Sequence, residues 1–240
     1  MSTSKTRCTL DRALSKLGIC SRKEALVLIR GGAVRVDATV CRDVGRFVTV
    51  GSTRIVVEGH DTVTRERRVI LLHKTKGVVT TKSDERGRPT VYSLLPADER
   101  DLHPIGRLDQ ATSGLLLFTN DNMLSARLTD PKNAIARVYL VTVRGEVTDI
   151  GRGKLLKGIV DDGEKLQAAD VTVRKASRKE THLVVTLRTG KNREIRRLLR
   201  AIGHEVTALK RVEFGGLKLG TLPAGKCRQV SEKEIREMFP

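Results

Sequence analysis

The segment Gly106-Arg107-Leu108-Asp109 brings together a guanidinium and a carboxylate that could perform chemistry. The apolar run Leu115-Leu116-Leu117-Phe118 follows, which predicts a loop that leads into a buried strand. Arg107 and Asp109 are two residues apart, so in an extended chain their side chains point the same way. An Asp beside an Arg stays ionised and can act as a nucleophile or a base. The residues alone leave open that Asp109 caps its own loop while Arg107 forms a surface ion pair.

A second basic segment lies near the C-terminal end. Between residues 188 and 211 there are eight basic side chains, opposed by Glu194 and Glu205. A helix over 193–203 would place four arginines on one face and an apolar stripe on the other; these arginines are Arg193, Arg196, Arg197 and Arg200. Charged helix faces are usually only solvated. Because like charges without interleaved acids repel one another, we predict a phosphate-binding surface here.

Motifs for other kinds of chemistry are absent from the sequence. It contains no GxxxxGK[ST], no GxGxxG after a strand, no HExxH and no GxSxG. The five histidines lack metal-ligand spacing, and the four cysteines include no CxxC pair. We therefore expect no metal, no cofactor and free thiols in a reducing cytoplasm. The N-terminal residues lack the apolar stretch of a secretory signal, and no apolar run approaches the ~18 residues of a membrane span.

Charge and aromatic content constrain the partner. The chain has 240 residues, 46 Lys and Arg against 28 Asp and Glu, and a net charge of +18. Such an excess favours a polyanionic partner such as nucleic acid. The sequence has no Trp, two Tyr and four Phe, which is too few for a protein that stacks successive bases on aromatic side chains.

The elements that must position these side chains fall into two predicted domains. Residues 8–58 predict two helices and short antiparallel strands, with a capping box at Ser21-Arg22-Lys23-Glu24 and a helix end at Gly31-Gly32. Residues 59–68 are polar and predict a linker. Residues 69–240 predict a larger domain.

In that larger domain, apolar and β-branched runs predict strands at 69–72, 113–118, 137–143 and 182–187. Helices are expected near 121–128, 148–157 and 193–203, and a last one after the capping box Ser231-Glu232-Lys233-Glu234. Because strands outnumber helices and short turns join many of them, the predicted fold class is α+β with a mostly antiparallel mixed sheet, preceded by a small α/β unit.

These segments together resemble the pseudouridine synthases that modify ribosomal RNA, in particular the RsuA-type branch. The stretch Pro104-Ile105-Gly106-Arg107-Leu108-Asp109 through Asp121 is very similar to the signature around that family's catalytic aspartate. Lys74-Thr75-Lys76-Gly77-Val78 resembles its Lys-Pro-x-Gly motif, with Thr75 where Pro is usual. Arg137-Val138-Tyr139-Leu140-Val141 resembles the strand with the active-site tyrosine, and residues 190–198 resemble a basic family segment. Residues 10–57 are similar to an S4-type RNA-binding domain.

The resemblance implies a cofactor-free isomerisation of uridine to pseudouridine. Asp109 would be the essential carboxylate, which either attacks the nucleotide or abstracts a sugar proton. Arg107 and Arg196 would neutralise and orient Asp109 or hold adjacent phosphates. Tyr139 would stack on the extruded base, with a part in proton transfer as a further role, and Ile195 would pack beneath the ring. One platform suffices for one flipped base, which removes the conflict with the low aromatic content.

Further residues would bind the RNA. In the S4-like unit these are Arg22, Lys23, Arg30 and Arg35, and in the larger domain they are Lys74, Arg193, Arg197 and Arg200. The implied partner is ribosomal RNA, folded or within a partly assembled subunit, with large-subunit enzymes slightly the more similar. We expect a monomer. Two alternatives stay open: a non-catalytic RNA-binding protein of ribosome assembly, and a basic protein that compacts nucleic acid without preference for folded RNA.

Overall fold

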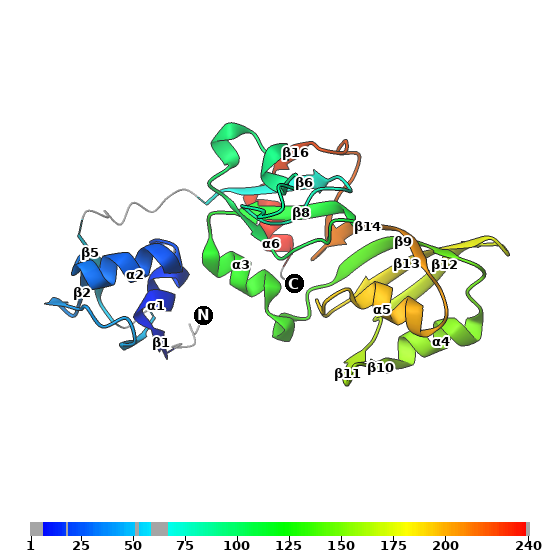
Figure 1. Ribbon diagram of the computed structural model, residues 1–240, viewed down its shortest axis with the longest axis horizontal. Coiled ribbons are helices and arrows are strands. Elements are labelled where there is room, and N and C mark those ends of the chain that lie inside the picture. Colours follow the sequence, from blue (N-terminus) through cyan, green and yellow to red (C-terminus); the bar gives the residue numbers. More distant parts are fainter. Residues whose placement is uncertain (1–6, 18, 51–52, 59–66, 239–240) are drawn as a thin grey trace. The chain divides into compact units, whose positions relative to one another are not determined.

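The structure is a computed structural model that describes residues 7–17, 19–50, 53–58 and 67–238 (Figure 1). Contacts divide the chain into two compact units. One runs up to Arg67 and includes Asn120–Leu124, and the other comprises Arg68–Thr119 and the chain from Ser125 onward. Most of the predicted linker, residues 59–66, lies outside the described residues.

The small unit combines two helices with short strands. Its strands are β1 (Arg7–Thr9), β2 (Val34–Val36), β3 (Thr39–Val40), β4 (Phe47–Thr49) and β5 (Ile55–Val57), and its helices are α1 (Leu10–Lys16) and α2 (Arg22–Gly31). β1 pairs with β4, and β3-β2-β5 form an antiparallel sheet.

Helix α2 begins and ends as the sequence predicts. Ser21 and Glu24 form a reciprocal capping box, and Gly32 follows the helix in the left-handed conformation. Apolar side chains from both helices and the strands, among them Leu14 and Ile29, are fully buried in one core.

The large unit is built on a nine-stranded sheet. Its strands are β6 (Val69–Lys74), β7 (His103–Ile105), β8 (Ser113–Thr119), β9 (Arg137–Arg144), β12 (Asp170–Ala176), β13 (Glu180–Leu187), β14 (Val206–Phe214), β15 (Leu217–Lys218) and β16 (Cys227–Gln229). The main order is β12-β13-β9-β14-β8-β6-β16, and β15 and β7 pair with β14 and β8. Among these strand pairs only β14 and β8 run parallel. The predicted mixed, mostly antiparallel sheet is confirmed.

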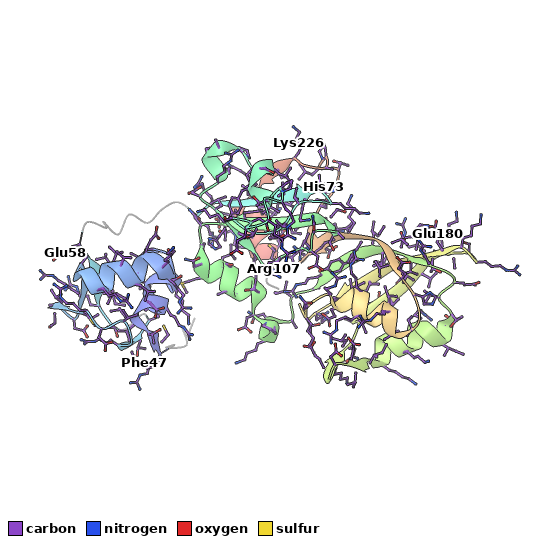
Figure 2. All side chains as sticks on the ribbon, viewed as in Figure 1. Phe47, Glu58, His73, Arg107, Glu180 and Lys226 are labelled. Carbon is purple, nitrogen blue, oxygen red and sulfur yellow. The ribbon has the colours of Figure 1, made fainter. Side chains whose placement is uncertain are left out.

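Residue patterns explain how the strands are buried. β6 is buried at every position, as expected for a continuous apolar run in the sheet interior, whereas β9 and β13 alternate between buried and partly exposed positions. At the edge of the sheet formed by β16, the backbone N–H of His73 donates to the carbonyl of Lys226 at 2.9 Å, and Figure 2 shows the two residues side by side.

Helices α3 (Asn122–Thr129), α4 (Asp149–Lys157), α5 (Glu194–Ala201) and α6 (Glu232–Glu237) lie at the predicted places. Short 3₁₀ turns occur at Val91–Leu94, Ala97–Glu99 and Pro131–Asn133, and a small hairpin is formed by β10 (Ile159–Asp161) and β11 (Glu164–Leu166). Leu198 and Leu199 of α5 share one core with Val141 and Val185 of the sheet, and Figure 1 shows α4 and α5 along the half of the sheet that contains β9, β13 and β12.

The described residues contain no helix that is long and apolar enough to cross a membrane. Nor do they contain a cluster of three His, Cys, Asp or Glu side chains that could hold a metal ion.

Candidate active site

A buried lysine holds the loop that carries Asp109 through hydrogen bonds to backbone carbonyls. Lys74 ends β6, and its side chain is fully buried. Its ammonium donates to the carbonyl oxygens of Thr75 at 3.0 Å, Asp109 at 3.1 Å and Thr112 at 2.8 Å. Burial lowers the pKa of Lys74 to about 8, against the attraction of Asp109. The prediction that Lys74 binds RNA is wrong, because this ammonium reaches only loop carbonyls.

Further hydrogen bonds fix the same loop from the segment after β6. The hydroxyl of Thr80 donates to the carbonyl of Leu108 at 2.7 Å and accepts from its N–H at 3.3 Å. Gly77 and Gln110 exchange two bonds, one through the Gln110 side-chain amide. The sequence after β6 therefore supports the loop around Asp109.

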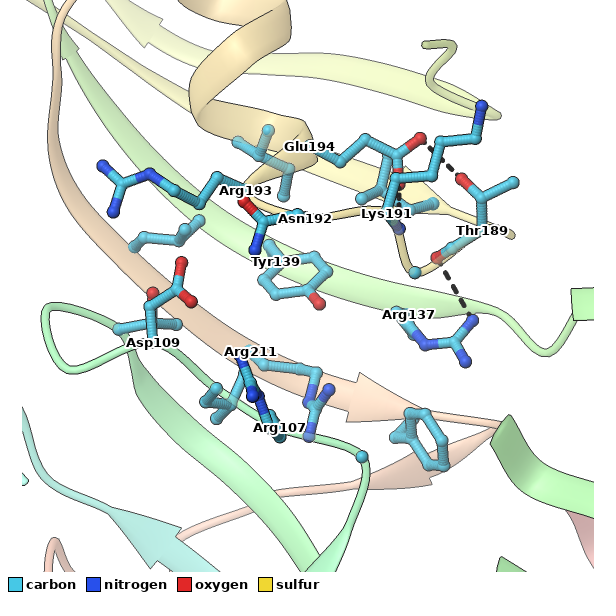
Figure 3. A pocket seen from close by; sticks show the side chains of 18 of the residues that line it. Arg107, Asp109, Arg137, Tyr139, Thr189, Lys191, Asn192, Arg193, Glu194 and Arg211 are labelled. Atoms are coloured by element: carbon cyan, nitrogen blue, oxygen red, sulfur yellow. Dashed lines mark hydrogen bonds between the residues drawn. The ribbon is translucent and has the colours of Figure 1, made fainter. Parts of the chain in front are cut away.

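Asp109 borders a cavity of about 390 Å³. The walls come from its own loop, β9, β14 and the turn that leads into α5. No hydrogen bond or ion pair joins the Asp109 carboxylate to any of the described residues. The carboxylate is half-buried, and in Figure 3 it faces the cavity across from Tyr139 and Arg193. A carboxylate that is held through its backbone and keeps its oxygens free is available to a ligand.

Tyr139 and Ile195 supply the apolar part of the wall. Tyr139 lies at a buried position of β9, and Ile195 lies in the first turn of α5. Both line the cavity, and both belong to the core of the large unit. In Figure 3 the Tyr139 ring lies in the middle of the cavity, between Asp109 on one side and Arg137 on the other. Such a surface suits a flat ring.

Arg196 also faces the cavity, with its guanidinium only partly paired. It donates to the carbonyl of Val206 at 3.1 Å and to that of Ala111 at 3.5 Å, so it joins α5 to the Asp109 loop. Its Nε is buried without a hydrogen-bond partner. Burial lowers the pKa of Arg196, and repulsion from Arg193 adds to this, while Asp109 opposes it.

Arg107 lines the cavity from an exposed position of the loop (labelled in Figures 2 and 3). Across the described part of the chain, neither Arg107 nor Arg196 forms an ion pair with Asp109. The two arginines are thus close enough to line the same cavity as the carboxylate but leave its oxygens unoccupied.

Two members of the predicted row of arginines on α5, Arg197 and Arg200, form ion pairs in the structure. Arg197 donates to Asp161 at 2.5 Å and to Glu164 at 2.6 Å, and its side chain is only 14% exposed. Arg200 lies 3.3 Å from Asp161 but stays 69% exposed. The acids come from the β10–β11 hairpin, which sequence spacing within the helix cannot reveal. Arg193 is exposed at the helix start.

Sequence reasoning missed two cavity arginines, Arg137 and Arg211. They are 8% and 3% exposed, and their guanidinium carbons lie 5.1 and 5.0 Å from the centroid of the Phe214 ring. A signal was present for Arg137, since residues i and i+2 of a strand share a face and Tyr139 was already a candidate. For Arg211 the sequence offered no separate signal, because Lys210 and Glu213 of the same strand are charged as well.

In the small unit, two of the predicted RNA-binding arginines form ion pairs. Arg22 lies 2.8 Å from the buried carboxylate of Asp11, and Arg35 lies 3.0 Å from Glu58. Burial acts to raise the pKa of Asp11, but hydrogen bonds from Thr9 and Arg22 hold it below its usual value. Lys23 and Arg30 are exposed on α2 and form no ion pair with the described residues.

Comparison with known proteins defines the class of this fold and site. Residues 68–201 match the RNA pseudouridylate synthase family, and residues 8–53 match the S4 domain. A crystal structure of a pseudouridylate synthase aligns with a TM-score of 0.68 at 26% identity, over 96% of this chain and 99% of that one.

Relatives that match over nearly their whole length belong to the same class of protein. The chain is 35% identical over 231 residues to the ribosomal large subunit pseudouridine synthase B of Bacillus subtilis, covering 95% of this chain and 94% of the relative. It is 38% identical over 236 residues to an RNA pseudouridine synthase of Mycobacterium tuberculosis, covering 96% and 92%. The chain belongs to the RNA pseudouridine synthase family and has an S4 domain at its N-terminal end. It is accordingly an isomerase.

Proposed function

We propose that the protein converts a uridine of large-subunit ribosomal RNA to pseudouridine and that Asp109 is its catalytic carboxylate. The family supports the reaction, and the name of the Bacillus subtilis relative supports the substrate. We expect a monomer that acts in the cytoplasm without a cofactor.

One observation carries the assignment of Asp109. Its backbone carbonyl is held by the buried ammonium of Lys74, yet its carboxylate has no partner among the described residues and faces the cavity. A purely structural Asp in a loop would satisfy its carboxylate with nearby N–H groups, as Asp84 does with Arg88. A free carboxylate fixed to the rest of the fold is what a nucleophile or base requires.

The surrounding side chains suit a single extruded nucleotide. A uridine in folded RNA must leave its stack before Asp109 can reach its sugar, at a cost of ~a few kcal/mol. Stacking on Tyr139 and packing against Ile195 offset that cost. Asp109 then attacks the nucleotide or removes a sugar proton, so that the glycosidic bond breaks. The uracil turns, and its C5 is joined to the ribose.

RNA outside the cavity is bound by basic side chains that remain accessible. We assign this role in the large unit to Arg107, Arg193 and Arg200. Lys23 and Arg30 would bind RNA in the small unit, since that unit matches the S4 domain and resembles an RNA-binding domain. The domains would be residues 8–58 and 69–240, joined by 59–68, with the first anchoring the RNA while the second performs the chemistry.

A direct test compares Asp109→Asn with the intact protein on large-subunit ribosomal RNA. The expected result is normal RNA affinity with no pseudouridine formed, because the amide keeps the shape of the side chain but can neither attack nor accept a proton at neutral pH. Asp149→Asn is the matched control: this side chain is 91% exposed on α4, and turnover should not change. Turnover by the Asp109→Asn protein would overturn the assignment.

A pseudouridine map of both ribosomal RNAs, made with and without the protein in the cell, tests the substrate. We expect one uridine of the large-subunit RNA to lose its modification. A change confined to small-subunit RNA would contradict the substrate assignment, and an unchanged map would favour the non-catalytic assembly protein.

A further inference from the structure

Arg211 is a nearly buried cation in the cavity with most of its hydrogen-bonding capacity unused. The residue is 3% exposed, and its Nε donates to the carbonyl of Leu115 at 2.7 Å. An arginine has five N–H donors. The terminal nitrogens of Arg211 donate to none of the described residues, and they are not among the fully enclosed, unpaired atoms found there. They therefore border open space, and the cavity that Arg211 lines supplies it.

The fold places Arg211 there through a close approach of two strands. β14 runs parallel to β8, with Arg211 opposite Gly114. A Cβ atom on Gly114 would lie 2.1 Å from the carbonyl oxygen of Arg211, and Gly114 has a φ of +109°. Only glycine permits this contact. Figure 3 shows Arg211 beside Arg107, next to the hydroxyl end of Tyr139.

A structural role alone does not account for this charge. Burying a guanidinium is costly unless it is paired, and no ion pair reaches Arg211 from the residues that the structure describes. A second cation, Arg137, shares the Phe214 ring with it, so the two repel each other. Arg137 donates its N–H groups to backbone carbonyls, including those of Ile135 at 2.8 Å and Thr189 at 3.3 Å. Of the two arginines, Arg211 therefore has more N–H donors available to a ligand.

The position decides which part of the RNA could be that ligand. Exposed Arg107 and Arg193 are available to the phosphates of the RNA, whereas Arg211 is nearly buried. In the proposed function the extruded base stacks on Tyr139, which is buried like Arg211. Building on the proposed function, we propose that Arg211 donates hydrogen bonds to a carbonyl oxygen of the extruded uracil and stabilises the charge of that ring while it is detached from the ribose.

The chemistry needs such a group. When the bond between C1′ and N1 breaks, its electron pair stays with the uracil, whose negative charge is shared among N1, O2 and O4. The bond from C5 to C1′ then forms, and the sugar gives up its bond to Asp109 or regains at C2′ the proton that Asp109 removed. C5 loses its proton to a base and N1 gains one, so the atoms balance. A fixed cation in the cavity interacts far more strongly with the negative charge that develops on the uracil in the transition state than with the neutral uracil of the bound substrate.

The test separates binding from turnover. In an Asp109→Asn background, Arg211→Gln should change RNA affinity by less than about threefold and leave its salt dependence unchanged. In the active enzyme the same change should lower kcat by about 100-fold, the usual effect of removing one preorganised donor. A tenfold loss of affinity with a salt slope reduced by about one would mean that Arg211 binds phosphate instead, and would overturn the proposal.

A substrate substitution keeps the test valid if Arg211→Gln is unstable. Arg211→Lys keeps the charge without the fork of donors. It should be compared with the intact enzyme on RNAs with 2-thiouridine or 4-thiouridine at the target, since sulfur is a poor acceptor. If Arg211 donates to O2 or O4, the thio substitution at that oxygen should lower the turnover of the intact enzyme. The same substitution should lower the turnover of the Arg211→Lys variant only slightly further, because the contact is already missing there. Independent, multiplying losses for both RNAs would refute the contact. If the intact enzyme forms no pseudouridine on unmodified RNA, the proposed function itself fails.

Discussion

Arg196 and Arg197 are neighbours on α5, yet the structure places them in opposite circumstances. Arg196 faces the cavity, where one of its nitrogens is buried without a partner. Arg197 faces the β10–β11 hairpin and forms ion pairs with both Asp161 and Glu164. In sequence the two side chains are equivalent members of one basic run. The difference comes from what the rest of the fold brings to each side of the helix.

This comparison separates arginines that stabilise the fold from arginines that await a ligand. Asp161 holds Arg197 across 36 positions of sequence, and the hydrogen bond from Arg197 lowers the pKa of Asp161. Among the described residues that line the cavity, the acids are Asp109 and Glu194. The Glu194 carboxylate already accepts from Thr189 and Lys191. The cavity side is therefore the one with unbalanced positive charge.

Removing each arginine in turn should give the largest difference between the two sides of α5. Arg196→Gln should lower kcat by about 100-fold, because it removes a cation from the wall that faces the reacting sugar. Arg197→Gln should lower kcat by less than about threefold, since its contacts lie outside the cavity. Single-turnover measurements on the same RNA check both.

Unfolding midpoints provide the control for that pair. Arg197→Gln should lower the midpoint more than Arg196→Gln, because it leaves two carboxylates of the hairpin without their cation. Equal losses of kcat in the two variants would remove the distinction between the two sides of α5.

The second prediction uses Lys74, a cation held inside the protein rather than at its surface. Lys74→Met should destabilise the large unit and reduce turnover, because three carbonyls around the Asp109 loop lose their donor. The pKa of Lys74 falls from 10.5 to about 8 on folding. Between these values the unfolded chain binds more protons, so stability rises with pH there.

The expected size of that rise is about 3 kcal/mol between pH 7.5 and 10.5, since one pKa unit is worth about 1.36 kcal/mol. Urea unfolding at the two pH values measures it, and Lys74→Met should lack this component. A rise of the same size in the Lys74→Met protein would show that other groups cause it.

A structural feature can be predicted from the sequence when the residues that determine it lie close together along the chain. Local signals succeeded: the capping boxes at Ser21 and Ser231 and the strand over 182–187 are present in the structure. They depend on residues a few positions apart. The motif resemblance likewise brought Asp109, Tyr139 and Ile195 to one cavity.

The predictions that failed depended on partners far along the chain. Lys74 is an ordinary basic residue in a motif until the fold closes the loop over it, and nothing near Arg197 in sequence indicates that Asp161 will reach it. Arg211 was missed because the register of β14 against β8 exists only in the folded sheet. Charge counts show how many cations are present, whereas tertiary contacts determine which of them are free.

Arg197 can also be released from its ion pair with Asp161 instead of being removed. Asp161→Asn removes a charge that pairs with both Arg197 and Arg200. If these arginines are close to bound RNA, the affinity should rise by roughly three- to tenfold at low salt, and the salt slope should steepen by up to about one. Filter binding at two salt concentrations measures both. No change in either would place this side of α5 away from the RNA.

In the small unit, Lys23 and Arg22 are likewise adjacent cations, one unpaired among the described residues and one paired with Asp11. Lys23→Gln should weaken RNA binding by about threefold and reduce the salt slope by about one, because its exposed ammonium forms no ion pair within the described part of the chain. Arg22→Gln, one position earlier, should leave the salt slope nearly unchanged but lower the unfolding midpoint. The reason is that the buried carboxylate of Asp11 loses the cation with which it pairs. If Arg22→Gln flattened the salt dependence as much as Lys23→Gln, pairing in the free protein would not predict which cations bind RNA.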